Sequence, residues 1–268
     1  MNTLIHSFVL TSLLLSAPAD AGKATRIIKD IEFARVDGHS LKLDLYLPTD
    51  TSDSSLVVWI HGGGWRGGSK KGCPVRWLTS HNYAVASLDF RLSDEARFPA
   101  QVHDCKGAIR WLRANAERFG CDGRRIAVIG GSSGGHLVAL VGTTNGVRTL
   151  EGNVGANLGH SSRVQAIVDM YGMTDLFYNA TVESTRCDLP DCPLYQLLGG
   201  KPSQRLQEAK AASPVFHVSF DDPPLLILLE IPLCLKPPKF KNYLFWSHIY
   251  KHFYFILGVT FVFVHSDS

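Results

Sequence analysis

IAVIGGSSGGHL, residues 126–137, is the stretch that decides the fold. It joins an apolar run typical of a buried strand, residues 125–129, to an apolar helix through a glycine-rich turn. Within the turn, Gly130-x-Ser132-x-Gly134 has the spacing of a nucleophile elbow. Glycines on either side of such a serine tolerate the crowding of a tight strand-to-helix turn, so its hydroxyl can project from the backbone.

A second register of the motif, Gly131-x-Ser133-x-Gly135, also fits. We favour Ser132 as the nucleophile because it follows the predicted strand by the expected two residues. A phosphate-binding turn is the main alternative for such a run of glycines. No lysine follows the glycines as a P-loop requires, and the dinucleotide pattern G-x-G-x-x-G is not met. The turn therefore indicates a serine nucleophile.

HGGGW at residues 61–65 is the second chemical signal, and it follows another apolar run, residues 55–60. Glycines let backbone N–H groups converge on a substrate oxygen without obstruction by side chains. A glycine triplet alone could be a flexible loop. Its pairing with a nucleophile elbow about 70 residues later favours an oxyanion loop.

Apolar periodicity divides the chain into strands and helices. Residues 27–34 and 41–47 alternate around an Asp-Gly pair and predict a β-hairpin. Residues 98–119 predict a helix with Lys106 off its apolar face, and residues 172–212 are polar and loop-rich. Further strands are predicted over residues 55–60, 83–88, 125–129, 164–171 and 224–229, and a short helix near residues 203–212. Strands that are apolar throughout and alternate with helices predict one α/β domain with a mostly parallel, doubly wound sheet covered on both faces.

These residues resemble the α/β-hydrolase fold, more closely the hormone-sensitive-lipase-like esterases, and within them the secreted group that contains acetylxylan and feruloyl esterases. The resemblance covers about residues 27–229. It is carried by HGGGW, DFRLS at 89–93, FPAQVHDCKGAIRWLRANAERFGCD at 98–122, IAVIGGSSGGHL, DMYGMTDL at 169–176 and AASPVFHVSFDDPPLLIL at 211–228.

The resemblance implies hydrolysis of acetyl or aromatic esters, including carbohydrate-linked ones, through an acyl-enzyme. It implies Ser132 as nucleophile and the N–H groups of Gly63, Gly64 and Ser133 as the oxyanion hole. It also implies an ester substrate as the binding partner, with neither a metal nor an organic cofactor. A peptidase of the same fold and a catalytically inactive binding protein are the alternatives.

The match to the family stops at about residue 229, where the composition changes. Residues 231–268 hold ten aromatic residues, four lysines and one acid. The formal net charge of +3 comes from this segment and gives no argument for nucleic-acid binding. The family's triad acid falls on Leu233, and its closing strand and Gly-His loop are not recognisable. We therefore expect an incomplete hydrolase domain, residues 27–230, with weak or absent turnover, because triad residues act as a unit.

Three interpretations of residues 231–268 compete. The abrupt loss of match favours a non-homologous end, produced by a gene-model error, a retained intron or a frameshift. A diverged end of the hydrolase would make residues 259–264 the last strand, with Glu230 as the triad acid and His265 as the base. A membrane anchor is the third, and the apolar run 253–264 is short of a bilayer span.

Other histidines and aspartates are weaker candidates for the base and the acid. Structural, packing or surface roles are predicted for His61, His103, His136 and His217. Asp169 and Asp175 flank a predicted strand end, where they either line the site or cap a loop.

The N-terminus predicts export. Residues 4–15 form a short apolar run followed by small-x-small cleavage patterns, so residues 1–19 are interpreted as a signal peptide and the protein as secreted or periplasmic. A frayed or membrane-associated N-terminus is the alternative. Export permits disulfides, and Cys187 and Cys192 border a short polar loop whose ends could close into a bridge. No cysteine spacing resembles a zinc site.

Overall fold

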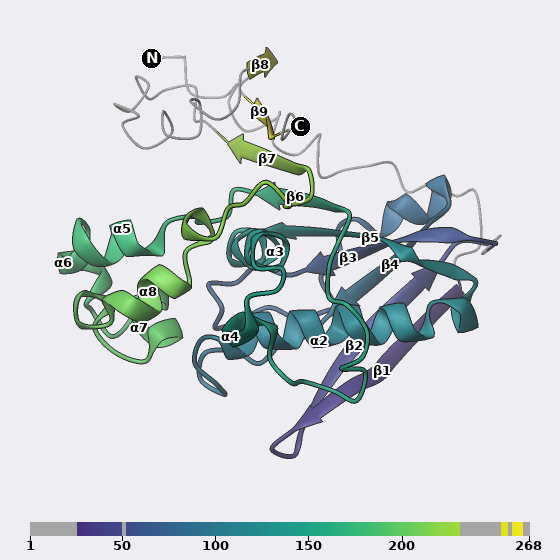
Figure 1. Ribbon diagram of the computed structural model, residues 1–268, viewed down its shortest axis with the longest axis horizontal. Helices are drawn as coiled ribbons and strands as arrows, with labels where there is room; N and C mark the ends of the chain where they lie inside the picture. Colours follow the sequence, from purple (N-terminus) through teal and green to yellow (C-terminus); the bar gives the residue numbers. More distant parts are fainter. Residues whose placement is uncertain (1–25, 50–51, 231–252, 257–258, 265–268) are drawn as a thin grey trace, which may run out of the picture.

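The computed structural model describes residues 26–49, 52–230, 253–256 and 259–264. They form a mixed sheet of nine strands in the order β1-β2-β4-β3-β5-β6-β7-β9-β8 (Figure 1). The strands are β1 (Arg26–Val36), β2 (His39–Leu47), β3 (Ser54–Ile60), β4 (Tyr83–Leu88), β5 (Cys121–Gly131), β6 (Ala166–Met170), β7 (Leu225–Glu230), β8 (Phe253–Ile256) and β9 (Val259–Val264). The five central strands run parallel. The predicted α/β class and the β1–β2 hairpin are confirmed.

Two long helices cover one face of the sheet, as Figure 1 shows. They are α2 (Ala100–Asn115) and α3 (Ser133–Thr143), which contact each other and β5. Beneath them, Ile60, Ile126 and Val128 are fully buried. The 3-10 helix η1 (Arg76–His81) contacts β2 and β4. On that side a second apolar cluster gathers Tyr46, Val57, Trp59, Cys73, Val75 and Val85.

Strands β6 and β7 depart from the prediction of burial on both faces. Ile167 and Ile227 are buried, whereas their neighbours Val168 and Leu228 are only half-buried. Helix α3 covers one face of β6, while η1 contacts β2 and β4, which lie on the other side of β5. A strand with apolar side chains on both faces is therefore not always buried equally on both faces.

The helix predicted over residues 98–119 is divided, because α2 ends at Asn115 and the 3-10 helix η2 (Glu117–Phe119) follows. Lys106 lies off the apolar face as predicted, yet its side chain is fully buried. Its ammonium group donates to the Thr144 carbonyl oxygen at 2.8 Å and to the Glu151 carboxylate at 2.9 Å. Lys106, on the polar side of α2, is thus covered by residues 144–151, which follow α3.

Residues 172–212 contain more helix than the sequence predicted. They fold into α5 (Leu176–Thr181), α6 (Ser184–Cys187), α7 (Pro193–Leu198), η3 (Pro202–Gln204) and α8 (Leu206–Ala211). Helices of four to six residues are too short to show a full apolar period. Figure 1 shows α5–α8 grouped at one end of the molecule, away from β1 and β2. The remaining short helices are α4 (Arg148–Glu151) and η4 (Pro214–Phe216).

The strand foreseen over residues 259–264 is present as β9, and it pairs antiparallel with β7. Val264 lies opposite Leu225, the first residue of β7, and Val259 lies opposite Glu230, the last. The chain therefore leaves β9 at the amino end of β7. In the described part of the chain, no helix is long and apolar enough to cross a bilayer. The predicted signal peptide, residues 1–19, lies outside the described residues.

Candidate active site

Ser132 lies between the last residue of β5 and the first residue of α3. Its backbone has φ +55° and ψ −121°, a conformation that L residues adopt only under strain. Two hydrogen bonds hold this turn: the Ser132 N–H donates to the Met170 carbonyl at 2.8 Å, and the Ser132 carbonyl accepts from the His136 N–H at 3.0 Å. The side chain of Ser132 is exposed, whereas Ser133 is buried and its hydroxyl has no partner. Of the two registers, the geometry favours Ser132.

The oxyanion loop that follows β3 lies directly against this turn. A Cβ atom added to Gly62 would sit 2.7 Å from the Gly131 carbonyl oxygen and 3.4 Å from the Ser132 Cβ. Glycine is therefore required at residue 62, because any side chain would push the two loops apart. Gly63 and Gly64 follow with φ +122° and +62°. The proposed oxyanion donors Gly63, Gly64 and Ser133 thus belong to two backbone segments in contact near Ser132, and their role stays a prediction.

His136 connects the oxyanion loop to α3. Trp65 Nε1–H donates to His136 Nδ1 at 3.0 Å, and the two rings meet edge to face with centroids 5.1 Å apart. With Nδ1 accepting, Nε2 carries the proton and donates to the Ala212 carbonyl at 2.7 Å. Complete burial lowers the pKa of His136 to about 4, so its ring is neutral at pH 7.

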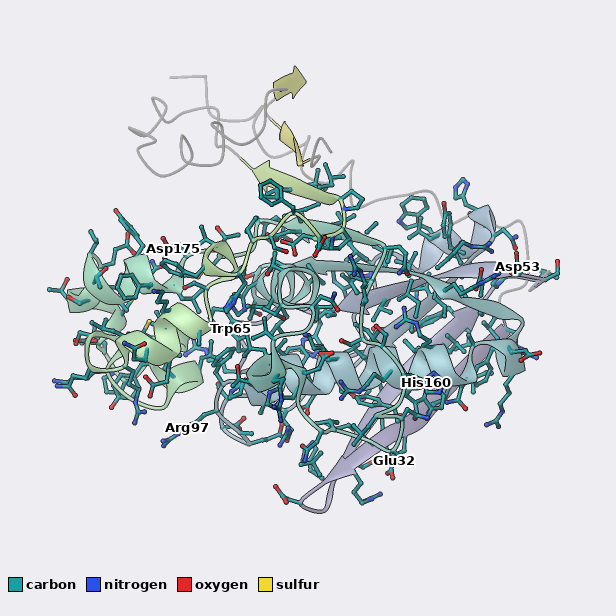
Figure 2. All side chains as sticks on the ribbon, viewed as in Figure 1. Glu32, Asp53, Trp65, Arg97, His160 and Asp175 are labelled. Carbon is teal, nitrogen blue, oxygen red and sulfur yellow. The ribbon has the colours of Figure 1, made fainter. Side chains whose placement is uncertain are left out.

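Trp65 is the partner that the sequence did not single out. It has a φ of +59° and is buried, and its carbonyl accepts from the Ser93 N–H at 2.8 Å. Figure 2 places Trp65 between α3 and the group of small helices. Its position directly after the glycine triplet was the available signal. The His136 ring thus holds the end of the oxyanion loop, in keeping with the predicted core imidazole.

The other histidines that were considered as bases have structural partners. His61 is buried, stacks on Phe90 at 4.4 Å and shares a 2.8 Å hydrogen bond with the Gly62 carbonyl. His103 and His217 contact the carbonyl oxygens of Thr149 and Ala211, each at 2.9 Å. Among the residues that the structure describes, no histidine is hydrogen-bonded to the Ser132 hydroxyl.

The acid and base of the diverged-end interpretation are placed only in part. Glu230 ends β7, and Gly131, Met170 and Leu228 lie in register across the sheet, so Glu230 is at the same carboxyl edge as Ser132. His265 lies outside the described residues. Strand β9 itself runs antiparallel to β7, with Val259 opposite Glu230 and Val264 opposite Leu225.

Asp169 caps a loop, one of the roles that the sequence left open, whereas Asp175 caps the start of helix α5. Asp169 Oδ1 accepts from the Gly172 N–H at 2.7 Å, and Asp175 accepts from the Tyr178 N–H at 2.8 Å at the start of α5. Burial raises the pKa of Asp169 to about 6. In the described part of the chain, no three metal-ligating side chains gather into a cluster.

Tyr171 is a second residue near the turn that the sequence reasoning missed. It has a φ of +51° and is 51% exposed. A Cβ atom added to Gly131 would lie 3.1 Å from the Tyr171 hydroxyl, which brings this phenol beside the residue that precedes Ser132. An exposed aromatic side chain therefore borders the elbow.

Solved structures of esterases are similar to this chain. A truncated form of a carbohydrate esterase from gut microbiota matches with a TM-score of 0.67 and 32% identity, over 78% of this chain and 78% of that chain. A bifunctional GH43-CE protein of Bacteroides eggerthii matches with a TM-score of 0.67 and 35% identity, over 75% of this chain and 30% of that chain. Propionate-bound esterase 2 of Thermogutta terrifontis matches with a TM-score of 0.58 and 26% identity, over 78% and 72%.

Curated esterases are also similar to this chain in sequence. Esterase LipC of Mycobacterium tuberculosis is 31% identical over 201 residues, which cover 73% of this chain and 49% of that protein. The probable carboxylic ester hydrolase LipM of the same organism is also 31% identical, over 71% of this chain and 44% of that protein. The chain thus spans about half the length of these relatives.

The model of the BD-FAE family matches residues 43–229. This range runs from β2 into β7 and contains both the oxyanion loop and the turn at Ser132. It stops where the sequence resemblance was expected to stop. The match spans more than half of the chain, agrees with the esterase relatives and includes the two loops that meet at the carboxyl edge of the sheet, and the chain therefore belongs to the BD-FAE family.

Proposed function

We propose that this chain is a serine carboxylic-ester hydrolase with Ser132 as its nucleophile. The observation that carries the proposal is the exposed, strained Ser132 against which the glycine-rich oxyanion loop is packed. Ser132 Oγ attacks the ester carbonyl carbon, while the N–H groups of Gly63, Gly64 and Ser133 stabilise the oxyanion. The hydroxyl proton passes to a base and then to the departing alcohol. Water hydrolyses the acyl-enzyme, which releases the acid and restores the hydroxyl.

We propose acetyl or aromatic esters as substrates, including esters carried on carbohydrate. Two matched structures are described as a carbohydrate esterase and a bifunctional GH43-CE protein, which supports the carbohydrate-linked class. The exposed ring of Tyr171 beside the elbow offers a flat apolar surface to an aromatic or sugar ring. Export by the predicted signal peptide, residues 1–19, belongs to the same proposal, since polymeric carbohydrate lies outside the cell.

We further propose that turnover by this chain is weak or absent. The described residues include the proposed nucleophile and the proposed oxyanion loop, but no histidine that is hydrogen-bonded to Ser132. A serine without its base loses the general-base step, and loss of the triad reduces kcat by about 10⁶-fold. A non-catalytic binding role is the second candidate, and the same observation favours it.

Labelling with a serine-reactive phosphonate, followed by peptide mapping, tests the nucleophile. We expect slow labelling of wild type at Ser132, none in Ser132→Ala, and unchanged labelling in Ser133→Ala as the control for the neighbouring hydroxyl. No labelling of Ser132 would reject an activated nucleophile and leave the binding role.

Hydrolysis of p-nitrophenyl acetate tests the turnover separately. We expect a rate close to that of the Ser132→Ala variant. Fast hydrolysis that both Ser132→Ala and His265→Ala abolish would contradict this expectation and assign the base to His265. Cleavage of amide substrates without cleavage of short acyl esters would indicate a peptidase instead.

A further inference from the structure

Two thiols, those of Cys187 and Cys192, lie near each other outside the proposed active site, close enough for Cys192 to affect the pKa of Cys187. Cys187 is the last residue of α6, and Cys192 directly precedes α7. Both are free cysteines: Cys187 is a buried member of the apolar core, and Cys192 is partly buried and packs against that core. The chain between them closes on itself, because the Cys192 N–H donates to the Leu189 carbonyl at 2.9 Å.

The other cysteines in the described residues have no such partner. Cys73, Cys105 and Cys121 are buried, and each lies among residues other than cysteine. Burial, together with the nearby Cys192 thiol, raises the pKa of the Cys187 thiol to about 11. Cys192 is the more exposed of the two, so an external reagent reaches it first.

The loop between these thiols supports the oxyanion loop. Arg66 Nη1 donates to the Asp191 carbonyl at 2.8 Å. A Cβ atom added to Gly64 would lie 3.3 Å from the Pro193 Cβ, so Pro193 packs directly on the glycine triplet. The Asp188 carboxylate accepts from the Ser203 N–H at 3.0 Å and from its hydroxyl. This single loop therefore links the oxyanion loop to the group of small helices.

We propose that Cys187 and Cys192 form a disulfide under oxidising conditions, and that this bridge fixes the loop against Gly64 and Arg66. A disulfide needs its two sulfur atoms next to each other with little backbone movement. The short loop, closed by the hydrogen bond from the Cys192 N–H to the Leu189 carbonyl, and the packing of both side chains on the same apolar core favour that arrangement.

The bond forms by exchange with a small disulfide such as oxidised glutathione. Cys192, as thiolate, attacks one sulfur of oxidised glutathione and releases one glutathione thiolate. Cys187 loses its proton and attacks the Cys192 sulfur of the mixed disulfide, which releases the second glutathione. Two protein thiols are thus oxidised while one glutathione disulfide is reduced to two thiols, and the two protein protons pass to the solvent or the departing thiolates.

Peptide mapping of the folded full chain tests the bridge. The chain is equilibrated with oxidised and reduced glutathione, free thiols are blocked with iodoacetamide, and the protein is digested with trypsin. Cleavage after Arg186 and Arg205 yields a peptide, residues 187–205, that contains only these two cysteines. We expect this peptide without alkyl groups and lighter by two hydrogen atoms than its dithiol form. Two alkylated cysteines in this peptide, or a bridge from either one to another cysteine such as Cys234, would overturn the proposal.

Hydrogen exchange tests the link to the oxyanion loop without relying on catalysis. We expect the amides of residues 61–66 to exchange several-fold more slowly in the oxidised wild type than in the reduced wild type. Cys192→Ser and Cys187→Ser should exchange at the reduced rate under both conditions. Equal exchange in oxidised and reduced wild type would reject the support of the oxyanion loop by the bridge. Both readouts are independent of ester hydrolysis, so either can fail while the proposed function stands.

Discussion

Replacement of His136 by glutamine should change how the stability of the protein depends on pH. Glutamine can accept from Trp65 and donate to Ala212 as the neutral imidazole does, but it does not titrate. The wild-type ring, being fully buried, has a pKa of about 4 against 6.5 for an ordinary histidine. As the pH falls below 6.5, the unfolded chain binds a proton that the folded chain excludes. This residue therefore makes the folded state progressively less stable down to pH 4.

The size of the effect follows from that difference in pKa. Integrating the proton uptake of the unfolded state from pH 7 to pH 4 gives a loss of about 3 kcal/mol in wild type that His136→Gln does not suffer. Every other titrating group is present in both proteins, so its contribution cancels in the difference. The variant can be less stable than wild type at pH 7, yet its disadvantage should shrink by about 3 kcal/mol at pH 4.

Urea unfolding followed by tryptophan fluorescence measures this difference. With a urea slope of about 3 kcal/mol per molar, the gap between the two midpoints should move by about 1 M between pH 7 and pH 4. Asp191→Asn, which alters an exposed carboxylate, is the control. Its difference from wild type in unfolding free energy should change by less than about 0.5 kcal/mol between pH 7 and pH 4. If the difference in unfolding free energy between wild type and His136→Gln stays constant within about 1 kcal/mol from pH 7 to pH 4, the neutral, buried imidazole and its hydrogen bond to Trp65 are refuted.

Two further substitutions probe the turn at Ser132. Asp169→Asn should change the pH dependence of stability in the direction opposite to His136→Gln. The folded Asp169 carboxyl, with a pKa of about 6, takes up a proton as the pH falls from 7 to 4, whereas the unfolded carboxyl does so mainly below pH 4. The unfolding free energy of wild type, measured in the same urea assay, should therefore rise by about 2 kcal/mol relative to the variant. A gap that is independent of pH would place this carboxylate in contact with water. Gly62→Ala forces a Cβ to within 2.7 Å of the Gly131 carbonyl and should lower the unfolding free energy by about 1–3 kcal/mol and slow phosphonate labelling of Ser132. Gly159→Ala, where nothing lies within 4 Å of the added carbon, is the matched control, and equal effects of the two substitutions would contradict the close packing of the two loops.

Local patterns predicted the elements whose conformation is fixed by their own residues. The hairpin of β1 and β2 turns at Asp37 and Gly38, which have φ +49° and +82°, the positive values that an Asp-Gly pair tolerates. The parallel strands were visible as apolar runs, although β5 extends back to Cys121. Helices α5–α7 were missed, because each depends on packing and caps rather than on a repeating apolar face.

The candidate site divides in the same way. Ser132 and the glycines of residues 62–64 stand out in the sequence, since the turn and the oxyanion loop need those residue types at that spacing. Spacing alone already favoured Ser132 over Ser133, and the fold adds a physical reason, because it exposes Ser132 and buries the hydroxyl of Ser133. The hydrogen bond of Trp65 to His136 could not be predicted, because a sequence pattern does not show which distant residue a side chain contacts.

The sequence by itself determined the α/β class and located the strand-to-helix turn at Ser132 and the glycine-rich loop, because conformations that require glycine and strands that require burial are recorded in local composition. The tertiary structure alone decided that Gly62 contacts Ser132, that Trp65 donates to an imidazole 71 positions away, and that β9 runs antiparallel to β7. These contacts join segments distant in the chain, and they form only where the packing of the whole sheet and its helices excludes water. Hydrolysis of an ester needs a general base close to the Ser132 hydroxyl, at the carboxyl edge of the sheet. Local motifs do not identify such a base, because its position depends on the fold of the whole sheet.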